Sequence, residues 1–194
     1  MNAPGEPSSP YSVDTDPVYR KNPHPAQAYR ITMTIEDAPG PFDWISGTAF
    51  YEMTNRDACT PFDRSLGMST KPKEDGIPIH FEKRNVFTYV ATIYADGMVD
   101  ADYYGKGVCT FELSGVGISL KATGKKEETR FQPVLFKSEI YSPAPKITYF
   151  WEGRYPKEDM ENFPDGGRLS VDQFNDDARN NVFKVTLIAE RVQL

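Results

Sequence analysis

The sequence predicts an all-β protein, an antiparallel β-sandwich of about nine strands with one short helix near the C-terminus. The chain of 194 residues contains 12 Phe, 11 Tyr and 2 Trp, and large rings suit half-buried pleated surfaces. The 16 Pro and 14 Gly restrict long helices. Several short segments alternate apolar and polar side chains, and no helix long enough for a crossover separates them. We expect one domain over residues 28–194.

The clearest predicted strand covers residues 29–36, where apolar and polar side chains alternate with period two. The turn residues Pro39-Gly40-Pro41 are expected to end it, because proline cannot donate to a ladder. The second strand is expected at 45–54. One face of that strand would carry Ile45, Gly47, Ala49, Tyr51 and Met53.

Seven further strands are predicted from alternation and from bounding Gly, Pro, Asn or Asp. They cover residues 77–83, 86–95, 107–113, 116–123, 130–137, 147–153 and 183–192. The longest segment without a strand is 154–181. Within it, Ser170 followed three residues later by Gln173 is a capping-box signature, which predicts a short helix at about 171–180.

Residues 1–27 are rich in proline and lack apolar periodicity, so we expect a disordered tail or tether. The first ten residues have neither a basic start nor an apolar stretch, so no signal peptide is expected. Either the protein is cytoplasmic, or a native leader has been removed. In the second case the location would be the periplasm or, with a lipid anchor, the outer membrane.

The charge pattern bears on the class of partner. A formal charge of −6 argues against nucleic acid, because most of the surface would repel phosphates. The same acidity suits a basic protein or a cation, although it also serves solubility alone. No stretch reaches the roughly 20 apolar residues of a transmembrane helix, so no span is expected.

The two cysteines, Cys59 and Cys109, are the smallest number that can form one bridge. Neither lies in a metal-binding or redox motif, so a disulfide is the preferred interpretation. Two buried reduced thiols are the alternative, since cytosolic proteins carry such residues routinely. A disulfide would favour an oxidising compartment of the cell envelope.

No catalytic motif stands out in the sequence. The chain lacks a nucleophile elbow, a zinc-protease motif, a phosphate-binding loop and a Cys-x-x-Cys pair. Of the two histidines, His24 lies in the tail, and His80 is expected to face solvent from a strand. We therefore predict a protein that is not an enzyme and needs no cofactor. An enzyme built on His80 would require that side chain to line a pocket.

An acidic run between two predicted strands is the first candidate site. Asp96, Asp100 and Asp102 could in principle gather around Ca²⁺, but their order does not match an EF-hand, and a solvated loop is the simpler interpretation. The neighbouring Tyr103 and Tyr104 favour a different use. Aromatic and acidic side chains on one exposed loop are typical of protein recognition, which makes Asp100, Asp102 and both tyrosines partner-binding candidates.

A second concentration of aromatic residues spans 149–155. In a strand, Tyr149 and Trp151 cannot share a face with Phe150, so one set needs a cover. Either the segment 154–181 folds back over it, or a partner does. The partner-binding candidates of this region are Glu152, Arg154, Tyr155 and Phe163.

Three stretches carry a resemblance to a known group. They are Thr34-Ile35-Glu36-Asp37-Ala38-Pro39-Gly40-Pro41-Phe42, Asp100-Ala101-Asp102-Tyr103-Tyr104-Gly105-Lys106-Gly107-Val108-Cys109 and Tyr149-Phe150-Trp151-Glu152-Gly153-Arg154-Tyr155-Pro156. They resemble small bacterial periplasmic proteins and lipoproteins that confer immunity by inhibiting antibacterial secretion-system effectors. The resemblance spans residues 28–192, and its motifs are not catalytic signatures. It implies binding to a cognate secreted effector, of which a lipase or phospholipase is one type.

We therefore expect an immunity protein that binds and neutralises a toxic effector in the cell envelope. The alternative is a calcium-binding or ligand-binding β-sandwich module of the envelope. A rigid scaffold with anchoring loops would serve the first role without any reactive side chain.

Overall fold

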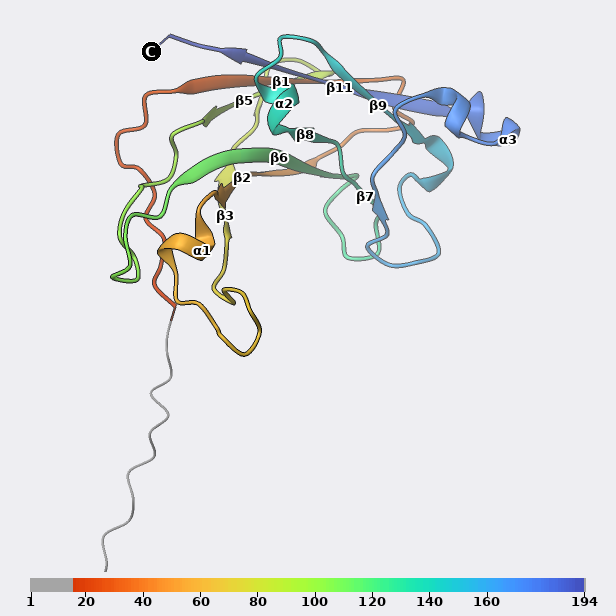
Figure 1. Ribbon diagram of the computed structural model, residues 1–194. Coiled ribbons are helices and arrows are strands. Elements are labelled where there is room, and N and C mark those ends of the chain that lie inside the picture. The colour runs from red at the N-terminus through yellow and green to blue at the C-terminus, as the bar shows by residue number, and fades with distance from the viewer. Residues whose placement is uncertain (1–15, 194) are drawn as a thin grey trace, which may run out of the picture.

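Two β-sheets face each other in the computed structural model, which describes residues 16–193 (Figure 1). The first sheet is antiparallel and has the order β4-β5-β1-β11-β9. Its strands are β1 (Ala28–Glu36), β4 (Glu82–Lys83), β5 (Thr88–Tyr94), β9 (Lys146–Trp151) and β11 (Val182–Arg191). The predicted all-β class is confirmed.

The second sheet has the order β10-β7-β6-β2-β3, and β8 pairs with β6. Its strands are β2 (Trp44–Met53), β3 (Glu74–Ile79), β6 (Phe111–Lys121), β7 (Arg130–Phe131), β8 (Val134–Phe136) and β10 (Pro164–Asp165). Among residues 16–193, only the short β10–β7 pair is parallel. The helices are single turns: α1 (Arg56–Cys59), α2 (Lys137–Ile140), α3 (Asp176–Arg179) and the 3₁₀ turns η1 (Glu152–Arg154) and η2 (Val171–Gln173).

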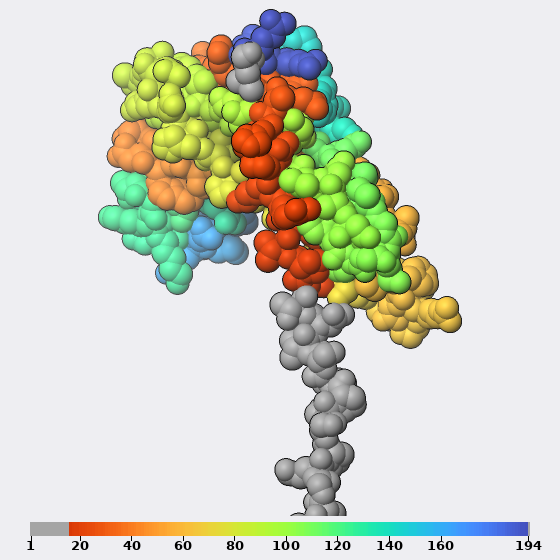
Figure 2. Space-filling model, turned by 90° about the vertical axis from the view of Figure 1, so that its left-hand side faces the viewer, coloured from red at the N-terminus to blue at the C-terminus, as the bar shows by residue number. Residues whose placement is uncertain are grey.

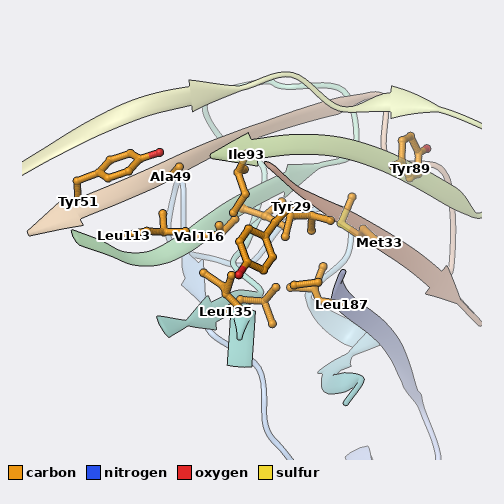
Figure 3. Packing of buried hydrophobic residues seen from close by; sticks show 14 of the residues in the cluster. Tyr29, Met33, Ala49, Tyr51, Tyr89, Ile93, Leu113, Val116, Leu135 and Leu187 are labelled. Carbon is orange, nitrogen blue, oxygen red and sulfur yellow. The ribbon is translucent and has the colours of Figure 1, made fainter. Parts of the chain in front are cut away.

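Period-two alternation determines which side chains enter the core. In β1, Ile31, Met33 and Ile35 are buried and lie between partly exposed neighbours. In β2, the face predicted from Ile45 to Met53 is the inner one, while Phe50 on the other face is exposed. The inner faces of the two sheets meet, and Figure 3 shows Met33 and Leu187 from the first sheet beside Leu135 from the second.

Four phenylalanine rings fill the part of the core nearest β9 and β7. Phe131, Phe150 and Phe183 are fully buried, and Phe42 is nearly so. Their ring centroids lie 5.2–5.7 Å apart, which is the range of favourable edge and offset contacts. Phe150 therefore belongs to the core set of the 149–155 segment.

The structure corrects several predicted boundaries. The strand predicted at 77–83 is two strands in different sheets, β3 and β4, because the chain crosses between the sheets there. The strands predicted at 107–113 and 116–123 are one strand, β6, whose irregularity is absorbed by a register shift opposite Phe50 and Tyr51. The segment 130–137 contains β7, β8 and the start of α2.

The helix predicted at 171–180 is also divided. The capping box forms as predicted, since Ser170 accepts from the Asp172 N–H and Gln173 bonds back to the Ser170 N–H. The turn it caps ends after η2, and a separate turn, α3, follows with Asn175 as its cap. A helix near the C-terminus is thus present, but only one turn long. The strand β10 and the turns α1 and α2 were not predicted.

The predicted tail is too long. Residues 16–27 pack along the loop that follows β5, as the red and green surfaces in Figure 2 show. The Asn22 N–H donates to the Gly97 carbonyl over 2.8 Å, and Tyr19 is buried. Asp96 accepts the N–H groups of Ala26 and Gln27, both over 2.9 Å. The rest of the predicted tail, residues 1–15, lies outside the described residues.

Candidate protein-binding surface

Three segments far apart in the sequence meet at one end of the molecule. They are residues 16–20, residues 55–73 with α1, and residues 99–109, and together we call them the stapled end (Figure 1). The predicted disulfide between Cys59 and Cys109 is present and joins two of them across 50 residues. Both cysteines are buried, so the bridge forms the inner support of this end.

Hydrogen bonds connect residues 16–20 to the other two segments, and a further bond joins those two segments to each other. The Tyr19 hydroxyl donates to the Pro72 carbonyl over 2.6 Å and lies 2.8 Å from the Tyr104 hydroxyl. Asn55 donates its side-chain N–H to the Val108 carbonyl over 2.9 Å. Because Tyr19 bonds to both long loops, the loops hold a defined position relative to each other.

The loop between α1 and β3 presents apolar side chains on this fixed base. At its tip, the Asp63 carboxylate accepts hydrogen bonds from the Ser65 hydroxyl and N–H, which lower the pKa of Asp63. At its base, the Thr60 and Ser69 hydroxyls lie 2.6 Å apart and are buried. The side chains of Phe62 and Leu66 therefore project from a loop that is closed at both ends.

Five large apolar side chains at the stapled end are 47–88% exposed. They are Val18, Phe62, Leu66, Met68 and Val108. Single exposed apolar residues are ordinary, but five on three adjoining segments make this end a candidate contact surface. None of the five was among the residues predicted from the sequence.

The predicted aromatic pair of the acidic loop is mostly used inside the molecule. Tyr103 lies edge-on to Tyr19, with ring centroids 5.1 Å apart, and donates to the Val99 carbonyl. Tyr104 meets the Tyr19 hydroxyl. Both rings are only partly exposed, because residues 16–20 cover them. Tyr103 and Tyr104 stay predicted partner-binding candidates, with rings that the chain itself partly covers.

The three aspartates of the acidic run do not form a common site. Asp96 binds the N-terminal segment, Asp100 accepts the Phe111 N–H over 2.9 Å, and Asp102 accepts N–H groups of its own loop. Burial would raise the pKa of Asp102, but the N–H groups from Tyr104 to Gly107 outweigh it and lower that pKa. Among residues 16–193, no three acidic, histidine or cysteine side chains are grouped as metal ligands.

The second predicted region, 152–163, is tied to the body of the protein. Arg154 bonds to Asp165 over 3.1 Å and to Glu158 over 3.3 Å, and its guanidinium lies 4.7 Å from the centroid of Phe163. Tyr155 donates to the Pro41 carbonyl over 2.6 Å. Arg154, Tyr155 and Phe163 are therefore partly buried and serve the fold, and Glu152 begins the turn η1.

The chain itself covers the face of residues 149–155 that was expected to need a cover. Arg168 pairs with Tyr149 through two backbone hydrogen bonds of 2.7 and 2.8 Å. The segment 154–181 thus folds back beside β9, and Trp151 lies in a cleft under it. His80, the alternative catalytic residue, is exposed where the chain passes from β3 to β4.

Comparisons of the chain with protein-family models, curated proteins and solved structures gave no match. In the described part of the chain, no helix has the length and apolar content needed to cross a bilayer. The case for a function therefore rests on the geometry of the chain itself.

Proposed function

We propose that the protein is an immunity protein that binds and neutralises a toxic antibacterial effector in the cell envelope, with the stapled end as its contact surface. The proposal depends chiefly on one observation, the five exposed apolar side chains, of which four lie on loops joined by a disulfide and the fifth, Val18, lies on the adjoining N-terminal segment. A cognate effector would bury them. Neutralisation by occlusion needs no reactive group, so we propose no enzymatic activity.

Rigid loops favour such binding. Ordering a loop on association costs about 0.5–1.5 kcal/mol for each immobilised side chain, and part of that cost is absent when the loop is already fixed. Here Cys59–Cys109 and the Tyr19 hydroxyl fix the loops before any partner arrives. The apolar side chains can then act as anchors for pockets on the partner.

The charge of the stapled end also suits an apolar contact. Its three segments contain six basic and five acidic residues, whereas the whole chain carries a formal charge of −6. Strong like-charge repulsion at this end is therefore avoided for partners of either sign. Selection would depend on the apolar side chains and on loop shape.

The disulfide is compatible with an oxidising compartment. We accordingly place the proposed activity in the periplasm or, with a lipid anchor, at the outer membrane, where a secreted effector would act. Effectors that attack lipids, such as lipases and phospholipases, are one class of partner under this proposal.

The proposal is tested by co-purification with the product of the adjacent gene as the candidate effector, and by survival of cells that express both. Phe62→Asp and Leu66→Asp place charges in the contact and are expected to weaken binding at least tenfold and to abolish protection. Leu169→Asp is the matched control, because Leu169 is as exposed as Leu66 (65% against 62%) but lies outside the stapled end.

Two results would count against this function. One is the absence of a complex and of protection with the native chain. The other is equal loss of binding in the Leu66→Asp and Leu169→Asp variants, which would show that the stapled end has no special part in the contact.

A further inference from the structure

A cleft of about 420 Å³ lies beside the end of β9, where the segment after η1 folds back over Trp151. It is in the size range of small-molecule sites. Its walls come from β9, η1, η2 and α3, which is a different part of the fold from α1 and the stapled end (Figure 1). The cleft is therefore not explained by the proposed effector contact.

Two opposite charges in this cleft have no ionic partner in the described part of the chain. The Arg168 guanidinium donates to the neighbouring Gly167 carbonyl over 3.0 Å, and the Asp177 carboxylate makes no bond to a described side chain. Neither forms an ion pair with any group among residues 16–193, nor with each other. Arg154, by contrast, is neutralised by Glu158 and Asp165.

Backbone contacts hold both charged residues in position. Arg168 is paired with Tyr149 of β9 through two hydrogen bonds of 2.7 and 2.8 Å. Asp177 lies in α3, where Asn175 caps the turn by accepting the Ala178 N–H over 2.9 Å, and the Asp177 carbonyl accepts from Asn181. The backbones of the two residues are thus fixed on separate elements, and both side chains are exposed at the cleft.

The remaining walls are aromatic. Trp151 and Phe174 are partly buried and line the same cleft. Gln173 is already used by the capping box, as its side-chain oxygen accepts from the Ser170 N–H and also from the Leu169 N–H. The cleft therefore combines one free cation, one free anion and a flat apolar surface.

We propose that this cleft binds a small zwitterion, an α-amino acid with an aromatic side chain. The ligand carboxylate would pair with Arg168, whose planar guanidinium matches a carboxylate. The ligand ammonium would pair with Asp177, and the ring would lie against Trp151. A zwitterion would pair with both protein groups, whereas a ligand with a single charge would pair with only one of them.

The binding test uses the fluorescence of Trp151 in a Trp44→Phe background, since the chain has 2 Trp. L-Phenylalanine is the probe, because it does not add tryptophan emission. We expect a saturable change, and at least tenfold weaker binding of N-acetyl-L-phenylalanine, which lacks the ammonium, and of L-phenylalaninamide, which lacks the carboxylate.

Variants that each remove one charge test whether Arg168 and Asp177 both contact the ligand. Arg168→Gln and Asp177→Asn are each expected to weaken L-phenylalanine binding about tenfold or more. Arg84→Gln is the matched control, because Arg84 is an exposed arginine near β4 and pairs with Glu82. Circular dichroism of each variant would establish that the fold is kept.

Equal affinity for L-phenylalanine and its N-acetyl derivative would overturn the proposal, as would an affinity unchanged in Arg168→Gln. Absence of any saturable change with L-phenylalanine would also overturn it. None of these results depends on the effector, so failure of the cleft and failure of the proposed function can be told apart.

Discussion

Glu128 shows how a single buried carboxylate can organise a turn. Its two oxygens accept hydrogen bonds from the Thr123 hydroxyl and from the N–H groups of Thr123, Gly124 and Lys125, over 2.5–3.2 Å. Burial would raise the pKa of Glu128, but these donors together lower it. The turn between β6 and β7 is therefore built around an ionised side chain.

We predict that Glu128→Gln destabilises the protein at pH 7 by about 1–3 kcal/mol, because the amide group faces donors with fewer acceptor sites. The folded-state pKa of Glu128 lies below its unfolded value. Its contribution is therefore fully present above the unfolded pKa and is lost as pH falls through the folded one. Urea unfolding at pH 7 and at progressively lower pH measures this difference.

Glu127→Gln is the control for that experiment, because Glu127 is the exposed neighbour of Glu128. It should change the free energy of unfolding little at either pH. A Glu128→Gln effect that stays constant as pH falls would show that shape, and not ionisation, is what the turn requires.

At the scale of elements, the N-terminal segment acts as an additional edge beside the 96–104 loop. Val99 donates its N–H to the Arg20 carbonyl over 2.9 Å, and Arg20 donates its N–H to the Tyr103 hydroxyl over 3.0 Å. Tyr19 contributes a buried ring between Tyr103 and Phe111, with centroids 5.1 Å away in both cases. This one residue therefore links the segment to the loop and to β6.

Removing that ring should release the loop. We predict that Tyr19→Ala costs about 3 kcal/mol of stability and speeds hydrogen exchange of the Val99 amide at least tenfold. Hydrogen–deuterium exchange with mass spectrometry measures the change. Val18→Ala is the paired control, because Val18 is 88% exposed and lies next to Tyr19 in the chain. Unchanged exchange in Tyr19→Ala would mean that the loop is held by its own contacts.

Local sequence pattern predicts the long strands, whereas strand boundaries and sheet membership depend on long-range contacts. The faces of β1 and β2 follow from alternation alone, because one side must be buried. The division of 77–83 between two sheets could not be predicted, since alternation does not say which sheet a strand joins. The break predicted between residues 113 and 116 is a bulge within one strand, because Phe50 pairs with Gly115 and Tyr51 with Leu113, which leaves one extra residue in β6.

The same dependence on long-range contacts explains why the candidate surface could not be predicted from the sequence. The exposed Tyr103 and Tyr104 expected from the sequence are covered by residues 16–20, a contact between positions 83 or more residues apart. The apolar loop with Phe62 and Leu66 could not be predicted, because its spacing matches neither a strand nor a helix. Its only signal in the sequence is large apolar residues among turn residues, directly after Cys59.

In the whole molecule, the disulfide joins a loop of the second sheet to the loop that connects the two sheets. Cys59 follows β2 through α1, and Cys109 lies between β5 of the first sheet and β6 of the second. The buried bridge contacts Met53 at the end of β2. It therefore stabilises the fold and the stapled end together.

We predict that the double variant Cys59→Ser, Cys109→Ser loses about 4 kcal/mol of unfolding free energy, as expected from chain entropy for a closed loop of this length. Reduction of the native protein should have the same effect, and reduction of the double variant none. Urea unfolding of the four samples measures this. A loss below about 1 kcal/mol would mean that packing alone holds the loops, because the entropic constraint would then be offset in the native state.

If the bridge also preorganises the contact surface, the double variant should bind the effector more weakly at temperatures where it remains folded, since the loops must then be ordered on binding.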